Sequence, residues 1–162
     1  MNRKLVLVTA AVAAATSAHL VAAIAKSVEI TSNWCPGLEV LSSTEVAPQQ
    51  MIATYKVSGG IRSTPAGSMF DLMNGVCQGV LSTVGGQTVA AGNCLWVDKD
   101  GDKVVFGYSR TAPAPGKLEF TLGTGKFSGI RGGGEYTTVP LPPIAGSRNS
   151  CPEAKWKFTL LD

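Results

Sequence analysis

The side chains most often used for catalysis are scarce in this sequence of 162 residues. The single histidine, His19, falls in a segment that we expect to be removed, which leaves serine and cysteine without their usual general base. A carboxylate could act as acid or base if it pointed into a dry cavity, but a solvated outer position is far commoner for such groups. The candidates are Glu39, Glu45, Asp71, Glu119 and Glu135. The sequence therefore assigns no catalytic residue, and an enzyme is the less favoured reading.

Three carboxylates at alternate positions, Asp98, Asp100 and Asp102, resemble the start of a calcium loop. The match is partial, because an EF-hand needs glycine at its sixth position and glutamate at its twelfth, and glycine here is fourth. A hairpin turn centred on Asp100 and Gly101, with Asp98 opposite Lys103, accounts for the same residues. We predict the turn and keep the metal site as a weak alternative.

Gly125 and Lys126 invite comparison with a phosphate-binding loop. However, Phe120 stands where that loop needs its first glycine, and Phe127 where it needs the serine or threonine that binds magnesium. The sequence thus predicts no nucleotide and no other cofactor.

Several aromatic residues fall in the alternating segments, where they could either line a ligand cavity or fill it. They are Tyr55, Trp96, Phe106, Tyr108, Phe120 and Trp156. We take them as the candidate binding residues for a small hydrophobic ligand, although solid packing is slightly favoured. The inward face of each strand, and hence the state of the interior, stays open at this point.

The four cysteines suggest two disulfides and an oxidising compartment. If Gly85 and Gly86 form a two-residue hairpin turn, Cys77 and Cys94 lie equally far from it and face each other. The remaining pair, Cys35 and Cys151, would then join the first ordered segment to the last. Free thiols or metal ligands are the alternative, but no C-x-x-C spacing is present.

The N-terminal segment has the layout of a secretory signal peptide, with Arg3 and Lys4 before an apolar stretch and a small-residue site ending at Ala25. We predict cleavage there, which leaves 26–162 as one domain in a secreted or periplasmic protein without a membrane span.

The net charge of the predicted mature protein is small. Loss of the leader removes two basic residues and leaves 12 basic residues against 11 acidic ones, without a basic cluster. Nucleic acid is therefore not expected as a partner.

After the leader, short alternating runs separated by glycine and proline predict about eight strands and no long helix. The clearest run is 153–160, and others are centred on 104–108 and 118–122. Further candidates are 38–42, 51–61, 70–83, 88–97 and 134–139, with the long loops at 111–116 and 140–152. Short turns favour an all-β fold in the form of an eight-stranded antiparallel barrel, with a two-sheet β-sandwich as the runner-up.

Six glycines in the fourteen residues 123–136, GTGKFSGIRGGGEY, indicate a strand end, a tight corner and a new strand, with Phe127 or Tyr136 lying across bare backbone. This corner, with the DKDGDK hairpin before it, resembles the allene oxide cyclase and dirigent-like β-barrels, a group that includes secreted bacterial members without an established role. The resemblance implies a barrel that holds a reactive intermediate and steers it by cavity shape. No working residue of those families can be matched to a position here.

Three functions follow from these observations. The first is a barrel that binds a small hydrophobic molecule or acts as a rigid surface module. The second is a cyclase- or dirigent-like protein, which an inward-facing carboxylate or arginine would favour. The third is a structural protein of the cell envelope without a small ligand. The sequence indicates neither the ligand nor the oligomeric state.

Overall fold

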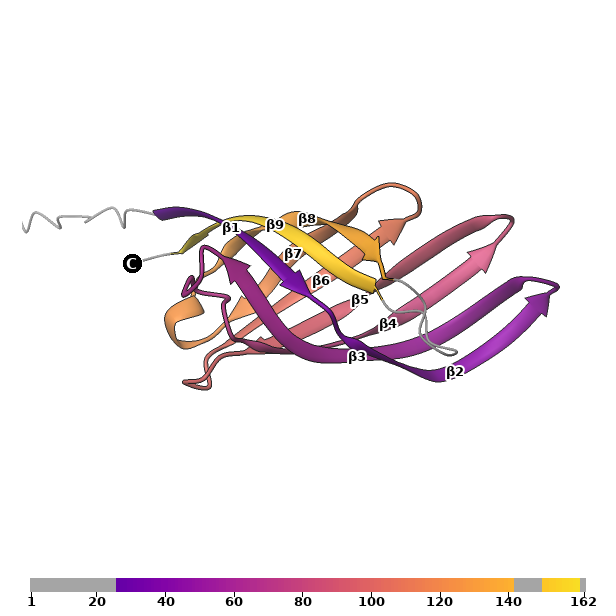
Figure 1. Cartoon of the computed structure of the whole chain (residues 1–162), viewed down its shortest axis with the longest axis horizontal. Coiled ribbons are helices and arrows are strands. Elements are labelled where there is room, and N and C mark those ends of the chain that lie inside the picture. The colour runs from indigo at the N-terminus through magenta and orange to yellow at the C-terminus, as the bar shows by residue number, and fades with distance from the viewer. Residues whose placement is uncertain (1–25, 142–149, 161–162) are drawn as a thin grey trace, which may run out of the picture.

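The computed structural model describes residues 26–141 and 150–160, and this part of the chain consists almost entirely of antiparallel strands (Figure 1). Its elements are β1 (Lys26–Trp34), β2 (Gly37–Ala47), β3 (Gln50–Thr64), β4 (Asn74–Val84), β5 (Gln87–Val97), β6 (Lys103–Thr111), β7 (Gly116–Gly123), a 3-10 helix (Gly125–Phe127), β8 (Arg131–Pro140) and β9 (Ser150–Leu160). The predicted signal peptide, 1–25, and most of the predicted loop at 140–152 lie outside the described residues. Within the described residues, no helix is long and apolar enough to cross a membrane.

Eight of these strands close into a barrel. The hydrogen-bonded order is β1-β9-β8-β7-β6-β5-β4-β3-β2, and β1 also pairs with β3, which completes the ring. β2 pairs with the first part of β3, stands outside the ring as an extra strand and is exposed along almost its whole length. The predicted eight-stranded antiparallel barrel is therefore confirmed, and the sandwich alternative is wrong.

The barrel has two different halves. In Figure 1 the β2–β3, β4–β5 and β6–β7 hairpins extend toward one end, while the connections β3–β4, β5–β6 and β7–β8 lie at the other. We call the half near the three hairpin turns the open half, and the other the closed half. The interior of the closed half contains Ile61, Phe70, Met73, Val104, Phe127 and Ile130, all at most 1% exposed.

Two loops fill the closed half: the 65–73 connection and the glycine-rich corner that contains Phe127. Phe70, which we predicted to begin a strand, instead lies in the 65–73 connection, and β4 starts only at Asn74. Its ring stacks on Phe158, with 5.1 Å between the ring centroids, and meets Trp156 edge-on at 5.5 Å. The Asp71 carboxylate holds this loop by accepting the backbone N–H groups of Gly67 and Ser63, which lower its pKa.

The first strand was missed by the sequence analysis. β1 directly follows the predicted cleavage site, and its inward positions Ile30, Ser32 and Trp34 include a serine, which weakens the apolar alternation. Ser32 is nevertheless buried, because its hydroxyl oxygen accepts the indole N–H of Trp156 at 2.8 Å. The strand matters because it joins β9 to β3 and so closes the ring.

Both predicted disulfides are present. Cys77 pairs with Cys94 in the β4–β5 register, and Gly85 and Gly86 at the turn both have positive φ, as this hairpin requires. Cys35, between β1 and β2, bonds to Cys151 in β9. This second bridge joins the connection between β1 and β2 to β9.

The Asp98 turn differs in detail from the prediction. Val97, not Asp98, pairs with Lys103, because the Asp98 carboxylate accepts the backbone N–H groups of Asp100 and Asp102 and so makes a larger loop. The ammonium of Lys126 forms an ion pair with Asp98 and lies 3.6 Å from Asp100. Within the described residues, no cluster of three or more potential metal ligands occurs.

The glycine-rich corner has the predicted form. β7 ends at Gly123, the 3-10 helix makes the turn, and β8 begins at Arg131. Phe127 and Ile130 from this corner are completely buried and cover the closed half. Gly125 has a φ of +53°, and a side chain there would collide with the Asp102 carboxylate. The corner thus packs against the neighbouring 98–102 turn.

Candidate functional site

A cavity of about 290 Å³ occupies the open half of the barrel. The strand registers place its lining in tiers, with aromatic side chains forming the floor next to the closed half and polar side chains nearer the hairpin turns. The residues that line it are Ser32, Trp34, Pro36, Leu38, Tyr55, Val57, Cys77, Leu81, Ala90, Cys94, Trp96, Phe106, Tyr108, Arg110, Leu118, Tyr136, Thr138, Ser150, Pro152, Ala154 and Trp156. All three tryptophans and all three tyrosines of the chain are among them.

The floor is a cluster of packed aromatic rings. Trp156 stacks on Phe120 at 5.0 Å between centroids, and Phe106 meets both Trp96 and Trp156 edge-on at the same distance. Trp96 lies against the bare backbone of Gly75, where a Cβ would approach its ring within 2.6 Å. Edge-on and offset contacts of this kind add to the stability that burial provides. The floor is therefore rigid and apolar.

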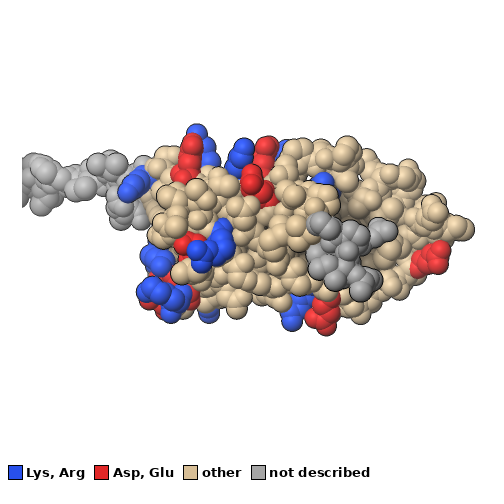
Figure 2. All heavy atoms as spheres, viewed as in Figure 1, with Lys and Arg blue, Asp and Glu red and all other residues tan. Residues whose placement is uncertain are grey.

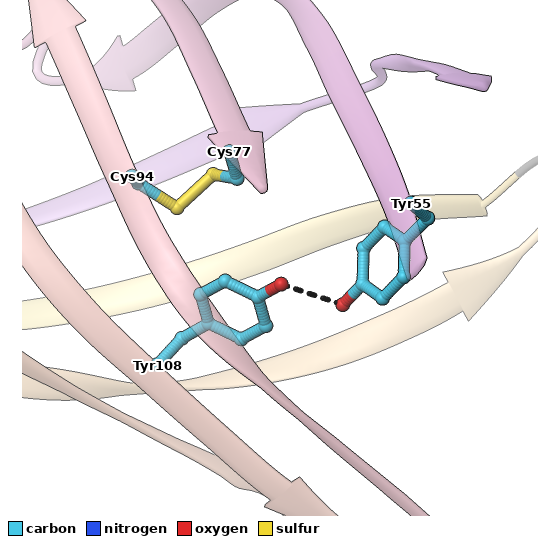
Figure 3. Close-up of a disulfide and its surroundings, with 4 residues drawn as sticks. All are labelled: Tyr55, Cys77, Cys94 and Tyr108. Carbon is cyan, nitrogen blue, oxygen red and sulfur yellow. Dashed lines mark hydrogen bonds between the residues drawn. A yellow bond between two sulfur atoms is a disulfide. The ribbon is translucent and has the colours of Figure 1, made fainter. Parts of the chain in front are cut away.

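Two tyrosines meet above this floor (Figure 3). Tyr55 on β3, Gly79 on β4, Gly92 on β5 and Tyr108 on β6 form one cross-strand row. Because the two central residues have no side chain, the Tyr108 ring can lie across them, and its hydroxyl donates to the Tyr55 hydroxyl at 2.7 Å. A Cβ on either glycine would collide with the Tyr108 hydroxyl. The Cys77–Cys94 disulfide joins β4 to β5 beside this pair.

A second tyrosine–glycine contact supports the opposite wall. Gly116 on β7 pairs with Tyr136 on β8, and a side chain at Gly116 would collide with the Tyr136 ring. Arg110 reaches the same region, where its Nη1 donates to the Thr138 hydroxyl at 2.6 Å and its Nε to the Ala114 carbonyl at 3.2 Å. These two bonds orient the guanidinium between the ends of β6 and β8.

The electrostatics of the cavity are one-sided. Among the described residues that line it, Arg110 is the only one that carries a charge at neutral pH, and no aspartate or glutamate is present. Burial raises the pKa of Tyr136 to about 12, with a further rise from Tyr55 and a partial offset from Arg110. Burial also raises the pKa of Tyr55, partly offset by its hydrogen bond with Tyr108, and raises that of Tyr108. The three phenols therefore stay neutral at physiological pH.

The structure brings most of the predicted binding residues together. Tyr55, Trp96, Phe106, Tyr108 and Trp156 line the cavity, while Phe120 lies beneath it in the core cluster. The five candidate carboxylates lie elsewhere: Glu39, Glu45, Glu119 and Glu135 are exposed, and Asp71 orders the loop of the closed half. None of them lines the cavity.

Three of the lining residues that sequence reasoning missed matter most for the chemistry of the cavity. Arg110 continues the inward alternation of Phe106 and Tyr108, but the sequence contains no basic cluster that would have drawn attention to it. Tyr136 was noted only for its packing across backbone, and Trp34 belongs to the strand that was not recognised. Extending the alternation of each strand to its end would have found the first of these.

Comparison with known proteins identifies a fold. No protein-family model matches the sequence, and no curated protein matches it. Among solved structures, a pterocarpan synthase dirigent protein is similar to this chain with a TM-score of 0.54 and 10% sequence identity, and the alignment covers 86% of this chain and 92% of that chain. At this identity the similarity concerns the fold alone. This chain therefore folds as a dirigent-like β-barrel, the group that its glycine-rich corner resembles.

Proposed function

We propose that this protein binds a small hydrophobic molecule in the cavity of the open half. The observation that supports the proposal is the cavity itself: an apolar, aromatic floor with a few polar groups converging above it. Ligand sites in proteins typically combine these features. The rigid closed half beneath would hold the walls in place, so that little ordering is needed when the ligand enters.

Tryptophan fluorescence tests this proposal directly, because all three tryptophans line the cavity. We expect saturable quenching or a spectral shift with at least one member of a panel of phenolics, terpenoids and short fatty acids. Ala90→Phe, which places a ring inside the cavity, should abolish the response. Ala91→Phe is the matched control, since Ala91 is the next residue on β5 and does not line the cavity.

A response that survives Ala90→Phe would place the binding elsewhere. If no compound gives a saturable response, the binding proposal is wrong, and the alternative is a rigid surface module or a structural envelope protein.

Arg110 favours a second candidate function, in which the barrel steers a reactive intermediate, as the resemblance to dirigent-like proteins and allene oxide cyclases implies. An inward-facing arginine together with three neutral phenols could orient such an intermediate by shape and hydrogen bonding. Chiral chromatography of products formed from an oxidised phenol tests this function. An unchanged enantiomer ratio with and without the protein, over a panel of phenols, would contradict it.

We also propose that the protein is exported. Two disulfides support this, since such bonds persist in oxidising compartments. Intact mass of the secreted or periplasmic fraction should correspond to cleavage after Ala25 with no free thiol. A full-length mass or four alkylatable cysteines would contradict the proposal.

A further inference from the structure

We infer that the ligand is a small aryl carboxylate, which binds with its ring on the aromatic floor and its carboxylate at Arg110. This inference rests on the proposed binding function and assigns the chemical class of the ligand. Four features of the cavity support it: its unbalanced charge, the free edge of the guanidinium, the neutral hydroxyl groups around it, and its size.

Among the described residues, no opposite charge accompanies Arg110 in the cavity. Within the described residues, Arg110 forms no ion pair with a carboxylate, and no acidic side chain lines the space around it. A half-buried cation loses part of its hydration, and an anion brought in by a ligand restores the balance. A ligand with one negative charge is therefore favoured over a neutral or a cationic one.

The guanidinium is already oriented for such a ligand. Its Nε bonds to Ala114 and its Nη1 to Thr138, so two of its donors hold the side chain in place. Within the described residues, Nη2 makes no hydrogen bond, and it is left to donate. A planar carboxylate fits this edge, because arginine and carboxylate groups form short charge-assisted hydrogen bonds.

The tyrosines add donors without adding negative charge. Tyr55 accepts the hydrogen bond from Tyr108, so its own proton can point to a ligand. Within the described residues, no side chain hydrogen-bonds to the Tyr136 hydroxyl, which stands near Arg110. Because all three phenols stay protonated well above neutral pH, they do not repel a carboxylate. The polar tier of the cavity is thus rich in donors and poor in anionic acceptors.

The size of the cavity limits the ligand. A volume of about 290 Å³ equals roughly ten water molecules at about 30 Å³ each. That space suits a ligand of about ten to fifteen non-hydrogen atoms, such as one ring with a short acidic side arm. The floor of Phe106, Trp96 and Trp156 offers ring edges and faces that favour an aromatic body over a flexible chain.

The test compares 3-phenylpropionate with 3-phenylpropan-1-ol, which has the same ring and chain but no charge, by isothermal titration calorimetry at pH 7. We expect the acid to bind the wild-type protein about tenfold more tightly, since hydrogen bonds to charged groups are the stronger ones. Arg110→Gln should reduce the preference to within about twofold, mainly through weaker binding of the acid. Arg110→Lys, which keeps the charge but not the planar fork, should retain part of the preference.

Arg131→Gln is the matched control, because it removes the same charge from an arginine that hydrogen-bonds to its own neighbour Ile130 and does not line the cavity. It should bind both compounds as the wild type does. Near-ultraviolet circular dichroism verifies that each variant is folded, and the wild-type comparison of acid and alcohol decides the question if Arg110→Gln is not.

Equal affinities for acid and alcohol in the wild type would overturn the inference while the proposed binding function stands. An acid preference that Arg110→Gln leaves intact would overturn the role of Arg110. If neither compound binds while a neutral member of the fluorescence panel does, the aryl carboxylate assignment is wrong. If nothing binds at all, both the assignment and the proposed function fail.

Discussion

The closed half and the open half of this barrel are built from the same strands, yet one is filled and the other is hollow. In the closed half, Phe70 and Phe127 enter from connecting loops and bury their rings completely. In the open half, inward positions of the walls are occupied by glycines such as Gly79 and Gly92. The difference shows that strand number alone does not decide whether a small barrel is solid.

The surface reflects the same division. On the face shown in Figure 2, acidic and basic side chains gather mostly over the closed half, and the open half is largely uncharged. Large apolar residues are exposed on the hairpins of the open half, among them Leu38, Val40 and Val46 on β2 and Ile52 on β3. The open half therefore presents most of the large exposed apolar residues.

The largest expected effect comes from emptying the closed half. Phe70→Ala should lower the free energy of unfolding by about 3–5 kcal/mol, because the ring is completely buried and leaves a void. Leu81→Ala in the open half should cost only about 1–2 kcal/mol, since Leu81 already borders a cavity. Denaturant unfolding measures both. Leu72→Ala, at a side chain 67% exposed, is the control and should change stability little. Equal losses for Phe70 and Leu81 would remove the distinction between the halves.

An intermediate effect on stability is expected where a glycine of the open half leaves room for a neighbouring side chain. Gly92→Ala should destabilise by about 1–3 kcal/mol, because the new methyl group would collide with the Gln78 carbonyl and the Tyr108 hydroxyl. Gly107→Ala on β6 is the matched control: the nearest atom to its Cβ would be 3.8 Å away, and the change should stay within about 0.5 kcal/mol. Thermal and denaturant unfolding compare the two. A Gly92→Ala protein as stable as Gly107→Ala would contradict the proposed packing of Tyr108.

The smallest expected effect is the change of the free energy of unfolding with pH. The unfolded chain releases tyrosine protons near pH 10, whereas the folded cavity keeps them to higher pH, about 12 for Tyr136. Between these values the unfolded state binds fewer protons than the folded state, so stability falls as pH rises through this window.

Tyrosinate absorbance reports this titration from the cavity alone, because the chain has no other tyrosines. We expect the folded protein to titrate above its urea-unfolded form, and Arg110→Gln to raise the Tyr136 pKa further, since Arg110 lowers it. Titration near pH 10 in the folded protein would show that water reaches the three phenols freely, which would contradict their burial in the cavity.

Much of the fold could be predicted from short stretches of sequence. Alternation identified Glu153–Leu160 within β9, and the glycine turn placed Cys77 opposite Cys94, because in a hairpin the register follows from the turn. Predictions failed where a residue depends on a distant strand. Phe70 continues an apolar run in sequence, but it leaves the sheet to plug the barrel. β1 was not recognised because Ser32 interrupts its apolar alternation, and the burial of that serine depends on a hydrogen bond from Trp156 on the distant strand β9.

The sequence by itself determined the local elements of this protein: an alternating all-β pattern, a hairpin with its disulfide, and a glycine corner. Only the tertiary structure decided that β1 closes the ring, that Tyr55 and Tyr108 meet although 53 positions separate them, and that Arg110 lies at the tier of Thr138 on β8. The physical reason is that side-chain direction follows from the local pleat, whereas the tier at which a residue meets its neighbours depends on the stagger of all the strands around the barrel.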